Sequence, residues 1–209
     1  MLELDWLKVD IMDNQHLVVI NSGSSSIKFT VYELNETLNK QLHGIVENIH
    51  IEPTLKLFDQ HNHLIKEQTF PKDYDYPFFF EFLLSTLKSS EFQFNLVAAG
   101  HRVVHGGREF YEPVLISDEL IQKLKKFIPF VPLHQPYNLE AIEVLSQLSP
   151  ELKQIACFDT AFHRTHPSIA DTFAIPHTFT EEGIKRYGFH GLSYEFIMHQ
   201  LHEQRVACF

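Results

Sequence analysis

Asn21-Ser-Gly-Ser-Ser-Ser-Ile-Lys28 lies between two apolar runs, Leu17-Val-Val-Ile20 and Phe29-Thr-Val-Tyr32. Because β-branched and aromatic residues favour strands, the two runs predict a β-hairpin. The residues between them are small and rich in hydroxyl groups, so backbone N–H and side-chain O–H groups can approach an anion there. Lys28 can add a positive charge beside a phosphoryl oxygen. An ordinary serine-rich turn is the alternative interpretation, and the spacing of a Walker A loop is absent.

The rest of the chain predicts an α/β domain in which a mixed sheet is flanked by helices. Further strands are expected at 41–51, 54–58, 64–70, 96–99 and 155–158. Helices are expected at 78–87, from an N-cap at Ser117 to Lys126, from an N-cap at Asn138 to 148, and from an N-cap at Ser193 to 204. Residues 1–15 contain no clear element, so we expect an N-terminal extension that starts at Met1 or Met12 and a domain that spans 16–204.

The composition argues against several classes of protein. The 209 residues carry a formal net charge of −10, which argues against a broad nucleic-acid surface. Cys157 and Cys208 are the two cysteines, and their apolar surroundings predict free thiols rather than a disulfide framework or a zinc knuckle. The apolar run 78–84 is too short to span a bilayer, and the N-terminus lacks the features of a signal peptide. We therefore expect a cytoplasmic protein that binds neither membranes nor nucleic acid.

Two charged residues follow apolar runs that predict buried strands. In α/β sheets, ligands bind beyond the carboxyl ends of the strands. Asp159 follows the run 155–158 and can hold a metal ion or orient a reacting group there. Arg102 follows the run 96–99, and its fork of N–H donors suits a carboxylate or a phosphate. The alternatives are a helix N-cap for Asp159 and a structural salt bridge for Arg102.

Two histidines, His134 and His190, lie in loops framed by proline or glycine and are candidate active-site residues. A solvated or hydrogen-bonding histidine is the alternative for each of them. His101 and His105 are four residues apart, but their segment is not predicted to be helical, so a zinc site is not expected. A Ser-His-Asp triad lacks support because the sequence contains no Gly-x-Ser-x-Gly elbow.

Five segments resemble, in order, the signature segments of the acetate kinases. They are Asn21-Ser-Gly-Ser-Ser-Ser-Ile-Lys28, Gly100-His-Arg-Val-Val-His-Gly-Gly107, Pro132-Leu-His-Gln-Pro-Tyr-Asn138, Phe158-Asp-Thr-Ala-Phe-His163 and Tyr187-Gly-Phe-His-Gly191. Each segment has low specificity alone, whereas five in register make the resemblance highly specific. Propionate kinases share the second segment, and butyrate kinases are not expected to show it.

The resemblance implies a ribonuclease-H-like domain of the actin-like ATPase type, with a mixed five-stranded sheet. It also implies transfer of the ATP γ-phosphoryl group to acetate, with Mg²⁺, to give acetyl phosphate and ADP. By position, the phosphate- and ATP-binding residues are Asn21, Ser24, Ser26 and Lys28, with Asn21 next to the metal ion. The catalytic residues are Asp159, His190, Arg102 and His134, and the substrate-binding residues are Arg102, Val104, Leu133 and Phe189.

The expected reaction does not require a strong general base. Acetate is already ionised at pH 7, so catalysis would consist mainly of in-line positioning and charge neutralisation. We therefore expect Asp159 to orient a partner or a metal ion rather than to remove a proton.

Members of this family are longer and carry a second domain of the same fold, which contains the nucleotide loops. No such loops can be located in the 209 residues. We therefore expect the acetate-side half of an acetate kinase, inactive alone, with 205–209 as the start of the nucleotide-binding domain and a homodimer in the full-length enzyme. The alternatives are a propionate kinase and a remnant that binds acetate or phosphate without turnover.

Overall fold

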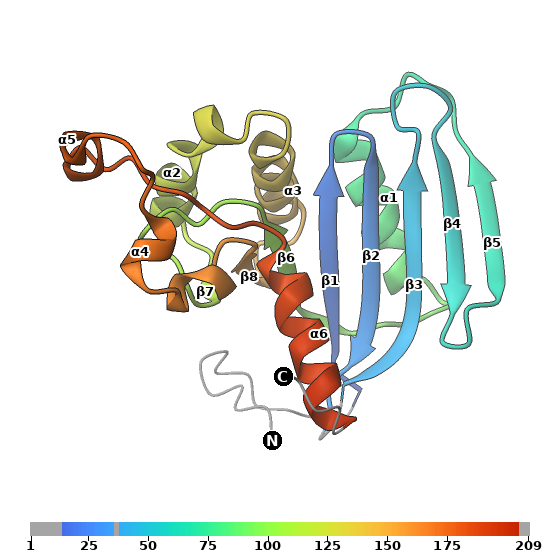
Figure 1. The fold of residues 1–209 in the computed structure, drawn as a ribbon. Helices are drawn as coiled ribbons and strands as arrows, with labels where there is room; N and C mark the ends of the chain where they lie inside the picture. The colour runs from blue at the N-terminus through green and yellow to red at the C-terminus, as the bar shows by residue number, and fades with distance from the viewer. Residues whose placement is uncertain (1–13, 36–37, 205–209) are drawn as a thin grey trace.

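The computed structural model describes residues 14–35 and 38–204. Both candidate start residues, Met1 and Met12, lie outside the described residues, as do Cys208 and the segment 205–209 that is expected to start the nucleotide-binding domain. Within the described part, a single large sheet is flanked by helices, as Figure 1 shows. No helix in this part is long and apolar enough to cross a bilayer.

The sheet has eight strands in the order β5-β4-β3-β2-β1-β6-β8-β7. The strands are β1 His16–Gly23, β2 Ser26–Glu33, β3 Asn39–Glu47, β4 Thr54–Asp59, β5 Leu64–Thr69, β6 Leu96–Val103, β7 Val114–Leu115 and β8 Lys153–Phe158. Strands β1 to β5 form an antiparallel meander, whereas β6 pairs in parallel with both β1 and β8. The sheet is therefore mixed, as predicted.

The expected number of five strands was wrong. The strands predicted at 54–58 and 64–70 do form, and they extend the same sheet because β4 pairs with β3 and β5 pairs with β4. The short strand β7 adds two residues beyond the other edge, antiparallel to β8. Each addition satisfies backbone groups of a strand that would otherwise be an open sheet edge.

The helical elements are α1 Tyr76–Lys88, α2 Asp118–Lys125, the 3-10 helix η2 Ile128–Phe130, α3 Gln135–Leu148, the 3-10 helix η3 Phe162–Thr165, α4 Ser168–Asp171, α5 His177–Glu181 and α6 Gly191–Glu203. Ser117 caps α2 as predicted, since its hydroxyl accepts from the Leu120 N–H at 3.2 Å.

Two predicted helix starts were wrong. Helix α3 begins at Gln135 and not after Asn138, because Pro136 is tolerated in the first turn of a helix. Helix α6 begins at Gly191, two residues before the predicted cap at Ser193. In both cases a residue that the sequence pattern placed in a loop belongs to the first turn of the helix.

The main core lies between the sheet and helices α1 and α3, on the face of the sheet behind the strands in Figure 1. Its fully buried members include Phe79, Phe80 and Leu145, and a second cluster around Leu124 and Phe158 joins α2 and α3 to β8. Helix α6 crosses the opposite face of the sheet (Figure 1). Large apolar side chains on α6 remain between 48% and 64% exposed: Tyr194, Phe196, Ile197 and Met198. The helices on the core face hold the carboxyl ends of β1, β6 and β8 in place.

Candidate active site

Four neighbouring strands each bring one polar side chain to the same end of the sheet. Lys28 lies on β2, Asn21 on β1 and Arg102 on β6, and Asp159 follows β8 directly. Asn21 and Lys28 are register partners in the antiparallel pair β1–β2, so their side chains leave the sheet on the same face. The parallel strands β1, β6 and β8 end here, at the edge where α/β sheets bind ligands.

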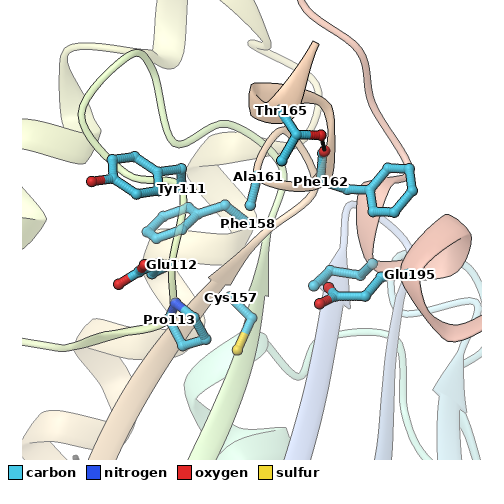
Figure 2. Close-up of a pocket in the computed structure, with 10 residues that line it drawn as sticks. Tyr111, Glu112, Pro113, Cys157, Phe158, Ala161, Phe162, Thr165 and Glu195 are labelled. Atoms are coloured by element: carbon cyan, nitrogen blue, oxygen red, sulfur yellow. Dashed lines mark hydrogen bonds between the residues drawn. The ribbon is translucent and has the colours of Figure 1, made fainter. Parts of the chain in front are cut away.

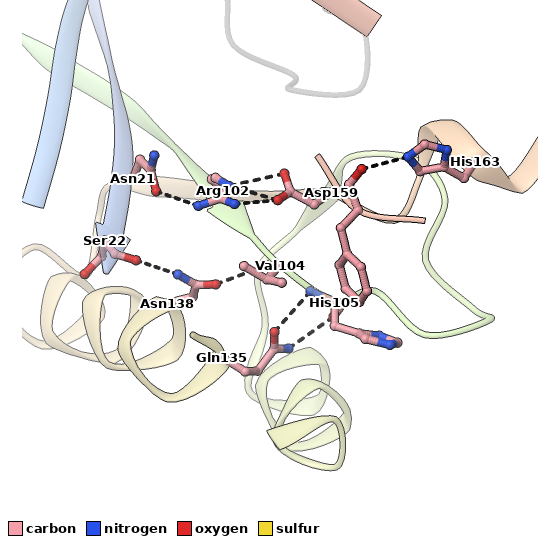
Figure 3. A network of polar contacts seen from close by, with 10 residues as sticks. Asn21, Ser22, Arg102, Val104, His105, Gln135, Asn138, Asp159 and His163 are labelled. Atoms are coloured by element: carbon pink, nitrogen blue, oxygen red, sulfur yellow. Dashed lines mark hydrogen bonds and ion pairs between the residues drawn. The ribbon is translucent and has the colours of Figure 1, made fainter. Parts of the chain in front are cut away.

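The guanidinium group of Arg102 is held from two sides (Figure 3). Its Nε donates to the two carboxylate oxygens of Asp159 at 3.0 and 3.2 Å, and its Nη2 donates to one of them at 2.6 Å. Its Nη1 donates to Asn21 Oδ1 at 3.1 Å. The Asp159 side chain is 2% exposed and the Arg102 side chain 29% exposed. The structural salt bridge considered for Arg102 is therefore present, and part of the Arg102 side chain still reaches solvent.

The carboxylate of Asp159 does not cap a helix. The N-cap of the nearby 3-10 helix η3 is Ala161, and the Asp159 oxygens are engaged by Arg102. The backbone N–H of Asp159 donates to the Val103 carbonyl at 3.0 Å, which continues the pairing of β6 and β8 past the last strand residue. The backbone of Asp159 is thus held by the sheet, and its carboxylate binds the guanidinium group of Arg102.

Two buried amide side chains on α3 hold the strand ends and the loop after β6, and the sequence pattern did not identify either as a site residue. Gln135 accepts from the His105 N–H and donates to the His105 carbonyl, both at 3.1 Å. Asn138 accepts from the Val104 N–H at 3.0 Å and donates to the Ser22 carbonyl at 2.6 Å. The two amides are three residues apart and so share one face of the helix. That spacing, at the helix-starting proline, is the signal that could have identified them.

The loop after β6 packs tightly because of Gly107. This residue has a φ of 65°, and a Cβ there would lie 2.2 Å from Cζ of Phe127. The Gly107 N–H donates to Nδ1 of His105 at 2.9 Å. Burial lowers the pKa of His105, so its imidazole is neutral at pH 7 and can accept this bond.

The start of α6 is tied to the residue that carries the carboxylate. His190 adopts a left-handed conformation with a φ of 58° and precedes α6 as its N-cap. The Gly191 N–H then donates to the Asp159 carbonyl oxygen at 2.8 Å, and a Cβ on Gly191 would lie 2.3 Å from that oxygen. Nε2 of His163 donates to the Phe189 carbonyl at 2.9 Å and holds the preceding residue of the loop.

We expect Gly191→Ala to destabilise the protein by about 1–3 kcal/mol, because the new methyl group cannot fit against the Asp159 carbonyl unless α6 moves. Urea unfolding followed by circular dichroism measures this loss. Gly23→Ala is the control, since a Cβ there would meet its nearest atom, the Ser26 carbonyl oxygen, only at 3.9 Å. Equal stability of the two variants would contradict a close contact between residue 191 and the Asp159 carbonyl oxygen.

A hollow of about 470 Å³ lies beside the end of β8 (Figure 2). Its walls come from the segment 111–113, from η3 and from the first turns of α6, and Cys157 forms part of its lining. Burial raises the pKa of the Cys157 thiol to about 11, with a smaller contribution from the charge of Glu195. The thiol is free, as predicted, and is protonated at neutral pH, so it is a poor nucleophile.

A model of the acetokinase family matches residues 16–206 of this sequence. The chain belongs to the acetokinase family. This confirms the resemblance that the five sequence segments carry, and with it the predicted ribonuclease-H-like, actin-like ATPase fold class.

The acetate and propionate kinases that this chain matches are about twice as long as the chain. Acetate kinases from Methylocella silvestris and Nitrobacter hamburgensis are 42% and 43% identical to it, over 90% and 87% of the chain but only 49% and 46% of those proteins. The crystal structure of a propionate kinase from Francisella tularensis matches with a TM-score of 0.80 and 35% identity, over 90% of this chain and 48% of that one. The Porphyromonas gingivalis acetate kinase structure matches with a TM-score of 0.75 and 34% identity, over 86% of this chain and 46% of that one. The chain therefore spans about half the length of these relatives.

The remaining residues that the acetokinase resemblance selects are less enclosed than Asp159. Val104 is buried, with 5% of its surface exposed, whereas Leu133 is 73% exposed. Phe189 is half-buried, and its ring lies 5.9 Å from the ring of His105. The exposed members of the set are Ser24, Lys28, His134 and His190, and Ser26 is half-buried at the start of β2. Their predicted roles stay predictions.

The described residues do not build a metal site for an acetokinase from protein ligands alone. The described part of the chain contains no group of three or more His, Cys, Asp or Glu side chains that could hold a metal ion. The one carboxylate at the centre of the site is engaged by Arg102, and Asn21 Oδ1, the predicted metal ligand, accepts a hydrogen bond from the same guanidinium group. A cation at Asn21 would therefore lie next to a positive charge.

Proposed function

We propose that this chain is the carboxylate-binding half of an acetate-kinase-type phosphotransferase, which transfers the γ-phosphoryl group of ATP to acetate. The observation that carries the proposal is that Arg102 is fixed by hydrogen bonds and is still partly exposed. It is held by Asp159 and Asn21 at the carboxyl ends of three parallel strands, yet its side chain is 29% exposed. Membership of the acetokinase family supports the reaction class.

Arg102 has donors left for a substrate. An arginine side chain carries five N–H groups, and the bonds from Nε, Nη1 and Nη2 use three of them. The two remaining N–H groups can bind one carboxylate or one phosphoryl group, and charge-assisted bonds of this kind are about twice as strong as neutral ones. The bonds to Asp159 and Asn21 hold the guanidinium plane before the substrate arrives.

In this proposal Asp159 orients Arg102 and balances its charge. Its carboxylate accepts from Arg102 and is shielded from solvent, so it is poorly placed to collect a proton from a substrate. Acetate needs no deprotonation at pH 7, which agrees with an orienting role. Rate enhancement then comes from in-line positioning and from charge stabilisation of the transferring phosphoryl group.

The phosphoryl group would approach from the side of the β1–β2 turn. Lys28 lies on the same face as Asn21, and Ser24 in the turn and Ser26 at the start of β2 supply hydroxyl groups. His134 and His190 supply further hydrogen-bond donors in the family-based assignment. Mg²⁺ would be carried by the nucleotide phosphates, in keeping with its preference for few protein ligands.

The proposal also includes the cellular location, the product and the assembly of the enzyme. We place the reaction in the cytoplasm, where ATP is available, with acetyl phosphate as product and a homodimer as the full-length assembly. Nucleic acid and membranes are not partners in this proposal. The 209 residues by themselves would bind the carboxylate without turnover, since they span about half the length of the acetate kinases they match.

Propionate is the second candidate substrate, because the structure with a TM-score of 0.80 is that of a propionate kinase. Val104 is the buried member of the predicted methyl pocket, and Leu133 on the outer side is 73% exposed. A pocket with one open wall admits an extra methylene group at a cost of only about 1 kcal/mol. We therefore expect a preference for acetate over propionate of less than about tenfold in this chain.

The proposal is tested by titrating acetate, propionate, butyrate and acetyl phosphate into the ¹⁵N-labelled chain, with Arg102→Ala as the control. Saturable shifts of the strand-end residues by acetate, lost in the control, are the expected result. A parallel assay with ATP and acetate should detect no acetyl phosphate from the 209 residues alone. Binding without turnover in the full-length enzyme would favour the non-catalytic alternative, and no binding at all would refute the assignment of Arg102.

A further inference from the structure

Strands β1 and β6 stop pairing with each other before either strand ends. Their parallel register runs as far as Ile20 opposite His101. β1 then continues to Gly23 in its pairing with β2, and β6 continues to Val103 in its pairing with β8. Asn21 and Arg102, the residues that follow the last β1–β6 pair, therefore lie where no backbone ladder sets the separation of the two strands.

The side-chain amide of Asn138 bridges the two strands just past this point. Its Nδ2 donates to the Ser22 carbonyl at 2.6 Å, and its Oδ1 accepts from the Val104 N–H at 3.0 Å (Figure 3). Asn138 is 2% exposed and lies in the first turn of α3, whose position is fixed by the core. One buried amide thus joins β1 to the residue that directly follows β6.

We propose that Asn138 is a positioning residue that sets the separation of the ends of β1 and β6, and thereby holds Asn21 on the guanidinium group that Asp159 binds from the other side. The guanidinium group needs both neighbours at the same time: Asn21 comes from β1, whereas Asp159 is carried by β8, which is paired to β6. A change in the β1–β6 separation would move Asn21 away from Arg102 and leave the Asp159 bonds intact. This proposal concerns the site of the proposed function, but its geometric part does not depend on that function.

The chemistry of the bridge requires an amide. One end must donate to a carbonyl and the other must accept from an N–H, and a carboxylate has no donor. Asn138→Asp would set a charged oxygen against the Ser22 carbonyl oxygen, from which the present nitrogen lies only 2.6 Å away. The separation of the strands would then increase.

Gln135 offers a matched control on the same helix. It is fully buried, and its amide holds the His105 N–H and carbonyl in the loop after β6 and also donates to the Leu124 carbonyl in α2 at 3.3 Å, but none of its bonds goes to β1. Gln135→Glu therefore repeats the amide-to-carboxylate change without altering a β1–β6 bridge.

The test measures the Arg102 side chain in the ligand-free, ¹⁵N-labelled chain. The Nε–H and Nη–H signals of Arg102 are assigned by their absence from Arg102→Lys. We expect Asn138→Asp to shift the Nη signals and to speed hydrogen exchange of the Nη1 proton bonded to Asn21 at least about tenfold. Gln135→Glu should lower the melting temperature and leave these signals near their wild-type positions.

Asn138→Ala provides a second variant without a buried charge, in case Asn138→Asp does not fold. The proposal is overturned if a folded Asn138 variant leaves the Arg102 signals unchanged, or if Gln135→Glu moves them as much. It is also overturned if neither Asn138 variant folds while Gln135→Glu does, since Asn138 would then act through stability alone. An acetate titration of the same variants, expected to show at least about tenfold weaker binding for Asn138→Asp, tests the proposed function separately, because the ligand-free signals can move even if acetate never binds.

Discussion

Arg102→Met is expected to lower the free energy of unfolding by about 3 kcal/mol at neutral pH and to abolish carboxylate binding. The stability loss arises because the Asp159 carboxylate, 2% exposed, would lose the guanidinium group that donates three hydrogen bonds to it. The binding loss arises because the two free N–H groups of Arg102 would disappear. Urea unfolding and acetate titration measure the two effects on the same protein.

The double variant Arg102→Met with Asp159→Asn separates the two effects. Removing the second charge should restore most of the lost stability, since a buried ion pair is costly to break on one side and much less costly to replace on both. Carboxylate binding should stay absent. If the double variant binds acetate, the substrate site lies elsewhere; if it is no more stable than the single variant, the ion pair is not the source of the stability loss.

Protonation of His101 should contribute a loss of about 3 kcal/mol in the free energy of unfolding as the pH drops from 6.5 to 4. Burial lowers the pKa of His101 from 6.5 to about 4, and a hydrogen bond from its Nε2 to Oε1 of Gln154 at 2.8 Å only partly offsets this. The unfolded chain then binds a proton in this pH range that the folded chain does not. Folding is therefore favoured above pH 6.5, and the advantage is lost as the pH approaches 4.

The measurement compares urea unfolding of the wild type and His101→Gln at several pH values between about 7 and 4. Glutamine keeps an N–H that can donate to Gln154 and has no charge to gain. The variant should lose about 3 kcal/mol less than the wild type over this range, although other buried histidines, His16 and His105, keep part of the pH dependence. His202→Gln, a change at an exposed position on α6, should behave as the wild type does. Parallel curves for the wild type and His101→Gln would contradict a neutral His101 in the folded state.

Local patterns in the sequence predicted the elements of the sheet well. The hairpin, the meander strands and the two buried parallel strands all appear, since alternation and short apolar runs report directly on which faces of a strand are buried. The number of strands in one sheet was wrong because it depends on which edges pair. The starts of α3 and α6 were wrong because Pro136 lies inside the first turn of α3 and a left-handed His190 precedes α6, whereas the sequence pattern favoured Asn138 and Ser193 as caps.

For the candidate site, too, the sequence predicted which residues to consider, and the structure showed how they contact one another. The ends of buried strands, together with the family resemblance, select Asn21, Arg102 and Asp159 as candidate site residues, because α/β sheets bind ligands beyond the carboxyl ends of their strands. What the sequence could not reveal is that Arg102 bonds both of the others at once. Neither could it reveal the part played by Asn138, whose partners Ser22 and Val104 lie 116 and 34 residues away along the chain.

The sequence by itself determined the family, the order of the longer strands and helices along the chain, and the residues that carry charge at the carboxyl edge. The family follows from the five signature segments, whereas the elements and the charged positions follow from residue type and short-range periodicity, which act over a few neighbours in the chain. Only the tertiary structure decided the eight-stranded pairing, the shared guanidinium group and the amide bridge between β1 and β6. Each of these depends on hydrogen-bond geometry to within a few tenths of an ångström between segments far apart in sequence, and such distances are set by how the helices pack on the sheet.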